Sequence, residues 1–190
     1  MAKLRTFIAV AATEEIRKQA EQLAEKLSHT PANVKWVERR NLHWTVKFLG
    51  DVDSNDIPSI CQAVGTVVGE IPPFEIIAQG AGAFPTLSRP RTVWLGTGRG
   101  DTQFVSLHNA ADLALIKLDF RSEHRRFRPH MTLGRVRRSP QGIDQLATLI
   151  AEHDKFDAGS MIVDELVIFT SQLDRDGPTY QVLARLPLSG

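Results

Sequence analysis

One stretch of the sequence alternates polar and apolar side chains strictly enough to constrain its local structure. In residues 41–50, NLHWTVKFLG, the polar residues His43, Thr45 and Lys47 take every second position among apolar neighbours. Successive side chains of a strand point to opposite faces, so the pattern predicts a strand with one face in the core and one polar face outside it. We expect Lys47 on the polar face, at the rim beyond Thr45.

A second stretch repeats this arrangement later in the chain. Residues 128–136, RPHMTLGRV, carry His130 and Thr132 at the same spacing, with Met131 and Leu133 on the opposite face. Each half of the chain has two helical patterns and one strand with the H-x-T motif, which indicates a weak internal duplication. We therefore expect an α+β architecture of two lobes, with two mainly antiparallel sheets and helices packed outside them.

Strand and helix patterns interleave along the rest of the chain. The clearest helix follows Thr13, a candidate N-cap, because Ile16, Ala20 and Leu23 recur at helical spacing. The other patterns predict strands at 5–10, 34–37, 74–84, 92–98 and 179–188, one long β-rich stretch at 160–170, and helices at about 54–70, 102–118 and 141–153.

Composition favours one compact unit. The chain has 190 residues, 42% of them hydrophobic, and no Gly-, Ser- or Pro-rich linker, so we expect a single bilobal domain over residues 1–190. Cys61 is the only cysteine, which excludes an internal disulfide and fits a reducing cytosol. With no apolar run of membrane-spanning length and no leader pattern, we expect a soluble, cytoplasmic monomer.

Positive charge is unevenly distributed although the net charge is only +1. The window 121–138 contains one acid, Glu123, and seven arginines, which predicts a local anion-facing patch that could steer an RNA backbone. These arginines are Arg121, Arg125, Arg126, Arg128, Arg135, Arg137 and Arg138.

The two H-x-T motifs suit phosphoester chemistry if the polar faces of the lobes meet at a cleft. A phosphodiester needs a base for the attacking oxygen, an acid for the leaving oxygen, and neutral donors for the non-bridging oxygens. Two imidazoles and two hydroxyls, from His43, His130, Thr45 and Thr132, supply these groups. The alternative is a pair of half-buried histidines that only hydrogen-bond to neighbouring strands.

Other kinds of site lack their sequence patterns. The chain has no H-E-x-x-H, no C-x-x-C and no G-x-x-x-x-G-K-[ST], so we expect no metal and no cofactor. The remaining histidines are predicted to be surface or capping residues; they are His29, His108, His124 and His153.

The two motifs, with their surroundings, resemble a known family. NLHWTVKFLGDV and FRPHMTLGRV, together with RTFIAV near the start and PRTVWLG between them, are similar to the two-histidine (2H) phosphoesterases. Within that superfamily they resemble the RNA 2',3'-cyclic phosphodiesterases, also described as LigT-like 2'-5' RNA ligases. The resemblance implies a bilobal fold with a pseudo-twofold axis and metal-independent opening of an RNA 2',3'-cyclic phosphate to a 2'-phosphate. It also implies a reversible 2'-5' ligase activity.

Residue roles follow from the same resemblance. It implies that His43 and His130 are catalytic and that Thr45 and Thr132 bind the phosphate. We assign His130 as the base and His43 as the acid on O3', although pseudo-symmetry leaves the reverse order open. Phe48 and Arg135, each five residues after its histidine, match positions that hold the nucleobase.

The position of Phe48 raises a structural question, because strict alternation puts an odd offset on the opposite face from the histidine. Either the strand twists or bulges after the threonine, or Phe48 belongs to the core.

Two alternative functions stay open from the sequence. The chain could be an RNA- or nucleotide-binding module with little turnover. It could also be a 2H phosphoesterase that acts on 2'-5' oligoadenylates or another cyclic phosphate.

Overall fold

The computed structural model describes residues 2–122, 126–137, 141–173 and 177–190. Within these ranges the chain forms nine strands and four α-helices. The strands are β1 (Lys3–Ala11), β2 (Val34–Trp36), β3 (His43–Asp53), β4 (Phe74–Phe84), β5 (Thr92–Thr97), β6 (His130–Val136), β7 (Asp157–Val163), β8 (Glu165–Leu173) and β9 (Pro178–Pro187). The helices are α1 (Glu14–Ser28), α2 (Ile57–Val68), α3 (Asp101–Ile116) and α4 (Ile143–Glu152), with short 3₁₀ turns at Arg39–Asn41 and Ser54–Asp56.

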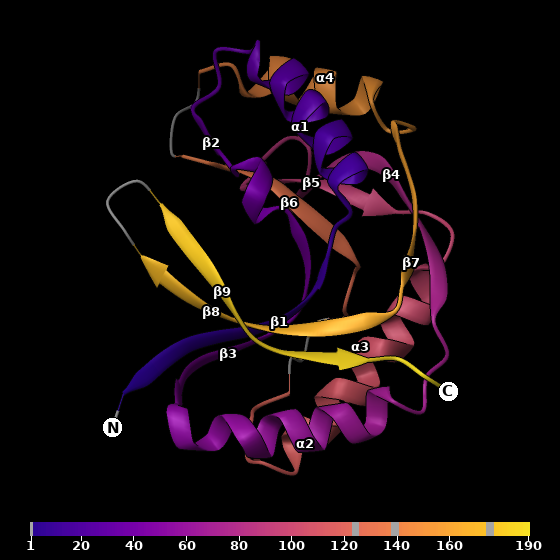
Figure 1. Ribbon diagram of the computed structural model, residues 1–190. Helices are drawn as coiled ribbons and strands as arrows, with labels where there is room; N and C mark the ends of the chain where they lie inside the picture. The colour runs from indigo at the N-terminus through magenta and orange to yellow at the C-terminus, as the bar shows by residue number, and fades with distance from the viewer. Residues whose placement is uncertain (1, 123–125, 138–140, 174–176) are drawn as a thin grey trace.

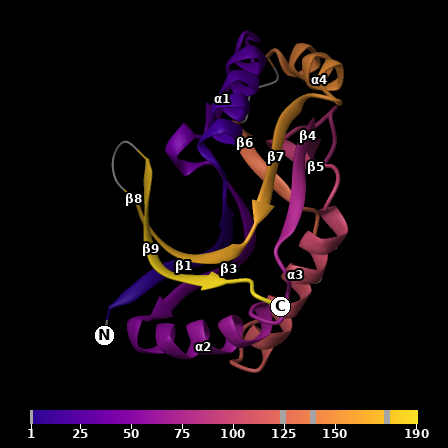
Figure 2. The same ribbon diagram turned by 45° about the vertical axis from the view of Figure 1, so that its right-hand side comes forward.

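The strands form one curled sheet in the order β7-β4-β5-β6-β3-β1-β8-β9, with β2 added to β6. Every neighbouring pair is antiparallel. Helices α1 and α4 cover the half that contains β4 to β7, whereas α2 and α3 cover the half that contains β1, β3, β8 and β9 (Figures 1 and 2). The predicted α+β architecture of antiparallel strands with outer helices is confirmed, and the pairing of β3 with β6 joins the two predicted sheets into one.

The two halves of the sheet meet at β3 and β6. Trp44 and Met131 are the paired residues at this junction, and both are fully buried. His43 and His130 directly precede these two residues, so the junction places both H-x-T motifs at the centre of the sheet.

The helices form where their apolar residues recur at helical spacing. Thr13 caps α1, because its hydroxyl accepts a hydrogen bond from the amide of Ile16 at 3.4 Å. The buried side of α1 includes Ile16, Ala20 and Leu23, as the spacing predicts. Among the described helices, none combines the length and the apolar character that a membrane span requires.

The predicted β-rich stretch at 160–170 is in fact parts of two strands. Asp164 separates β7, which pairs with β4, from β8, which pairs with β1. The chain therefore crosses from one half of the sheet to the other at this residue. Local composition does not reveal the break, because neither glycine nor proline occurs within the stretch.

The junction predicts where a core substitution costs most. Trp44→Ala removes a fully buried indole between the two halves, so we expect the free energy of unfolding to fall by about 3–5 kcal/mol in a urea titration. Leu113→Ala is the control, because this side chain on α3 is exposed and its loss should change stability by less than about 0.5 kcal/mol. Equal effects of the two substitutions would contradict the structural role of the junction.

Candidate active site

Strands β3 and β6 carry the same irregularity at the same distance from their histidines. In β3, the pairing with β1 passes from Thr45 to Lys47 and leaves Val46 as an extra residue. In β6, the pairing with β5 passes from Thr132 to Gly134 and leaves Leu133 as an extra residue. Each bulge thus follows directly after the threonine of its motif.

A bulge changes the face to which the following residues point. Phe48, after the bulge in β3, is 60% exposed, and its ring lies 6.0 Å from that of Phe7, which in turn lies 5.0 Å from the ring of His43. Arg135, after the bulge in β6, is also exposed. The bulge considered from the sequence is therefore present, and Phe48 is not a core residue.

Lys47 differs from the sequence prediction for the same reason. The bulge turns its side chain away from the face of Thr45, and only 2% of Lys47 is exposed. The ammonium forms an ion pair with Asp112 on α3 and donates a hydrogen bond to the carbonyl of Arg121 at 2.7 Å. The expected position at the rim of the polar face is wrong.

His108 also belongs to the buried support behind β3, not to the surface as predicted. Its Nδ1 donates to the carbonyl of Val46, the bulge residue, at 2.9 Å, and its ring stacks on Phe127 with centroids 4.0 Å apart. Asp112, one helical turn further along α3, accepts a hydrogen bond from Ser122 at 2.6 Å. These hydrogen bonds and the Lys47–Asp112 ion pair connect the bulge in β3 to α3 and to the segment before His130.

Two of the remaining histidines do match their prediction. His29 and His153 occupy the C-cap positions of α1 and α4. His124, Arg125 and Arg138 lie outside the described residues.

The two motif histidines are held in the same way. Nδ1 of His43 donates to the carbonyl of Asn41 at 2.7 Å, and Nδ1 of His130 donates to the carbonyl of Arg128 at 2.7 Å. A carbonyl can only accept, so the neutral tautomer carries its proton on Nδ1 and leaves Nε2 as the basic nitrogen. Nε2 of His43 accepts a hydrogen bond from the hydroxyl of Thr45 at 2.9 Å.

Burial makes both imidazoles poor bases in the free protein. Desolvation lowers the pKa of His43 to about 4, against the opposing effect of the Asn41 carbonyl, and the charges of Arg17 and His130 lower it further. Desolvation also lowers the pKa of His130, together with the charges of Arg135 and Arg128. A positive charge on one imidazole disfavours a positive charge on the other, so at most one of the two histidines is expected to be protonated.

Aromatic side chains from strands distant in sequence surround the histidines. Tyr180 on β9 meets His43 edge-on at a centroid distance of 5.4 Å, and Phe84 on β4 meets His130 edge-on at 4.9 Å. The guanidinium of Arg128 lies over the Phe84 ring at 5.7 Å. The sequence assigned no role in the site to Phe7, Tyr180 or Phe84, because only the curled sheet brings them together.

Phe48 and Arg135 lie in different halves of the sheet. Phe48 belongs to the aromatic cluster with Phe7, whereas Arg135 lies close enough to Tyr180 to affect its phenol. Burial raises the pKa of Tyr180, and the charges of Arg135 and Arg5 oppose this rise. Because β3 and β6 run antiparallel through the Trp44–Met131 pair, Phe48 and Arg135 follow their histidines in opposite directions along the sheet.

A metal cluster is not apparent in the described part of the chain, where no three His, Cys, Asp or Glu side chains gather in a way that could hold an ion. The groups at the junction that can act on a ligand are imidazoles, hydroxyls, guanidinium groups and aromatic rings. Such a set fits a phosphate ester joined to a flat base.

Comparison with known proteins agrees with this geometry. The sequence matches the family described as LigT like Phosphoesterase over residues 10–94 and 100–180. An RNA 2',3'-cyclic phosphodiesterase of Methanothermobacter thermautotrophicus is 39% identical over 94% of this chain and 95% of its own. A protein of the same name from Thermotoga maritima is 35% identical over 98% and 97% of the two chains.

Solved structures show the same fold. E. coli LigT complexed with 3'-AMP superimposes with a TM-score of 0.78 at 26% identity and covers 99% of both chains. TT0787 of Thermus thermophilus gives a TM-score of 0.80 at 24% identity over 98% of this chain and 99% of its own.

The curled sheet and the paired H-x-T strands define a two-histidine phosphoesterase. The chain belongs to the LigT-like phosphoesterase family, and the resemblance seen in the sequence is confirmed.

The buried pair behind β3 predicts coupled effects on stability. Lys47→Met or Asp112→Leu alone leaves an unpaired buried charge, so each should lower the free energy of unfolding by about 3 kcal/mol or more. The double variant should be destabilised clearly less than the sum, as measured by urea unfolding in a double-mutant cycle. Lys35→Met, at an exposed position on β2, is the control for removal of a lysine. Additive effects would show that the pair does not act as a unit.

The low pKa of His43 predicts a dependence of stability on pH. The unfolded chain takes up a proton near pH 6.5, but the folded protein does so only near pH 4. The unfolded state therefore binds more protons between these values, and stability is full above pH 6.5 and falls as the pH drops toward 4, by at most about 3 kcal/mol.

His43→Gln removes this contribution. The difference in unfolding free energy between the native protein and the variant should shrink between pH 7 and pH 4.5, as measured by urea titration at several pH values. A constant difference across this range would contradict the lowered pKa.

Proposed function

We propose that this protein is an RNA 2',3'-cyclic phosphodiesterase that opens the cyclic phosphate at an RNA end and leaves a 2'-phosphate. The observation that carries the proposal is the pair of histidines on either side of the Trp44–Met131 junction, each with Nδ1 fixed by a carbonyl. The names of relatives that align over nearly the whole chain support the same substrate. We further propose that residues 1–190 form one bilobal domain that acts as a cytoplasmic monomer.

The reaction requires one neutral and one protonated imidazole. Neutral His130 accepts a proton at Nε2 from water, and the water oxygen attacks phosphorus. The bond from phosphorus to O3' breaks, and Nε2 of protonated His43 donates its proton to that oxygen. The 2'-phosphate remains on the ribose, and the same displacement with a 5'-hydroxyl in place of water forms a 2'-5' linkage.

Binding of the phosphate would raise the pKa of an imidazole, so that one of the two histidines takes up a proton. Both histidines are neutral at pH 7 in the free protein because burial lowers their pKa values. An anion between the rings favours the charged form of an imidazole, and repulsion between the rings disfavours a second charge. A bound phosphodiester would therefore leave one imidazole protonated as the acid and the other neutral as the base.

Other side chains would bind the substrate. Hydroxyl groups of Thr45 and Thr132 donate to the non-bridging oxygens, which carry the charge that develops during attack. Phe48 stacks with the nucleobase as an exposed ring, and the guanidinium of Arg135 approaches from the other half of the sheet. No step in this scheme requires a metal.

The proposal predicts hydrolysis of nucleoside 2',3'-cyclic phosphates in the presence of EDTA, with a 2'-phosphate product identified by chromatography. His43→Ala and His130→Ala should each lower kcat by about 10²- to 10⁴-fold, because each removes one proton transfer. His29→Ala, at the exposed end of α1, should leave kcat unchanged.

Each alternative outcome has a distinct meaning. A 3'-phosphate product would contradict the assignment of O3' as the leaving oxygen. Nucleotide binding without turnover after long incubation would favour a binding module. Faster cleavage of 2'-5' oligoadenylates than of cyclic phosphates would favour another 2H phosphoesterase.

A further inference from the structure

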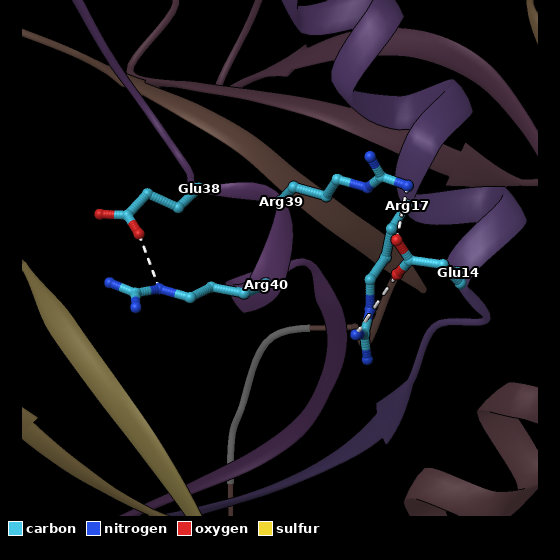
Figure 3. A pocket seen from close by; sticks show the side chains of 5 residues that line it. All are labelled: Glu14, Arg17, Glu38, Arg39 and Arg40. Carbon is cyan, nitrogen blue, oxygen red and sulfur yellow. Dashed lines mark ion pairs between the residues drawn. The ribbon is translucent and has the colours of Figure 1, made fainter.

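A groove lined by arginines leads away from His43. A cavity of about 160 Å³ is lined by His43, Arg17, Arg40 and other residues, and an adjoining cavity of about 380 Å³ shares the same two arginines and adds Arg39. Figure 3 shows the second cavity, where the three guanidinium groups come from α1 and from the turn before β3. We call Arg17, Arg39 and Arg40 the arginine groove.

Carboxylates pair unevenly with the arginine groove. Arg39 is bound by Glu14 at 2.5 Å and by Glu21 at 3.4 Å, and Arg40 is bound by Glu38 at 2.7 Å. Figure 3 shows the pairs with Glu14 and Glu38. Arg17 has only a distant contact with Glu14, at 4.0 Å. Three carboxylates thus face the three arginines, and the most weakly paired cation, Arg17, also lines the cavity beside His43.

Two further observations single out Arg17 among the three arginines. Its Nε is buried and has no hydrogen-bond partner among the described residues. Its charge reaches His43, because it contributes to the lowered pKa of that imidazole. The Arg17 side chain is 26% exposed and lines both cavities, so its guanidinium is a charged donor that an anionic oxygen could reach.

We infer that the arginine groove binds a backbone phosphate of the RNA strand, one nucleotide before the cyclic end. This inference rests on the proposed function, in which His43 protonates O3', because the ribose that bears this oxygen must then lie on the His43 side. The strand continues from the 5'-carbon of that ribose, and Arg17 and Arg40 line the space beside His43.

The direction of β3 agrees with this arrangement. The turn that carries Arg39 and Arg40 precedes His43, whereas Phe48 follows it along the strand. The nucleobase at Phe48 and the preceding phosphate at the arginine groove therefore lie on opposite sides of the reacting phosphate. The substrate class is an oligoribonucleotide with a 2',3'-cyclic end, and a mononucleotide fills only part of the site.

The test compares two substrates in each variant: cyclic 2',3'-AMP, and the dinucleotide ApA with a 2',3'-cyclic phosphate. We expect the native protein to have the higher kcat/KM for the dinucleotide. Arg17→Ala with Arg40→Ala should reduce the ratio of the two kcat/KM values by roughly tenfold, as expected when a charged hydrogen bond is removed. The ratio cancels any effect of Arg17 on the chemistry at His43, since both substrates undergo the same reaction.

Two matched variants distinguish an effect of the arginine groove from a general effect of lost positive charge. Lys18→Ala removes a neighbouring exposed cation from α1 outside the groove and should leave the ratio unchanged. Arg40→Ala alone changes a side chain that is 66% exposed, so folding is preserved and a partial fall in the ratio is expected. For the dinucleotide, the slope of log kcat/KM against log salt should fall by about 0.7 for each arginine–phosphate pair that a substitution removes.

Binding of the products decides the question without turnover. The native protein should bind the 2'-phosphate of ApA more tightly than 2'-AMP in calorimetry, and the double variant should bind both about equally. Equal affinities in the native protein, or an equal decrease for both ligands in the double variant, would overturn the phosphate site. Absence of hydrolysis with this binding preference intact would instead refute the proposed reaction and leave the groove in place.

Discussion

The site depends on the way in which two strands touch at one residue pair and then bulge. Trp44 and Met131 join the two halves of the sheet, and each of the strands β3 and β6 inserts one extra residue directly after its threonine. Without these bulges, strict alternation would direct Phe48 and Arg135 to the covered side of the sheet. The bulges therefore let the histidine, the threonine and an exposed Phe48 or Arg135 side chain share one face in each half.

Buried polar groups stabilise the bulge in β3 from behind, and this support differs between the two halves. His108 binds the carbonyl of Val46, and Lys47 is paired with Asp112 on α3. The corresponding position in β6 is Gly134, where an added Cβ would meet Val34 and Trp36 at less than 3 Å. A charged network thus supports one bulge, and close packing of β2 supports the other.

Much of the fold and the centre of the site could be predicted from local patterns. The spacing of His43 and Thr45 among apolar residues was enough to identify the strand, and its repeat at His130 indicated the second half. The inward position of Lys47 could not be predicted, because a bulge has no period that the sequence displays. Tyr180 and Arg17 reach the site only through sheet curvature and helix packing, which depend on contacts far apart in the chain.

The pseudo-twofold arrangement does not make the two histidines equivalent, because their surroundings differ. His43 is enclosed by Phe7 and Tyr180 and faces the charge of Arg17, whereas His130 adjoins Phe84 and the charges of Arg128 and Arg135. A symmetric pair could supply either the acid or the base, but an asymmetric substrate must present its ribose to one side only. A cavity lined by Arg17 and Arg40 lies beside His43, so the walls of the site distinguish the two histidines although their motifs do not.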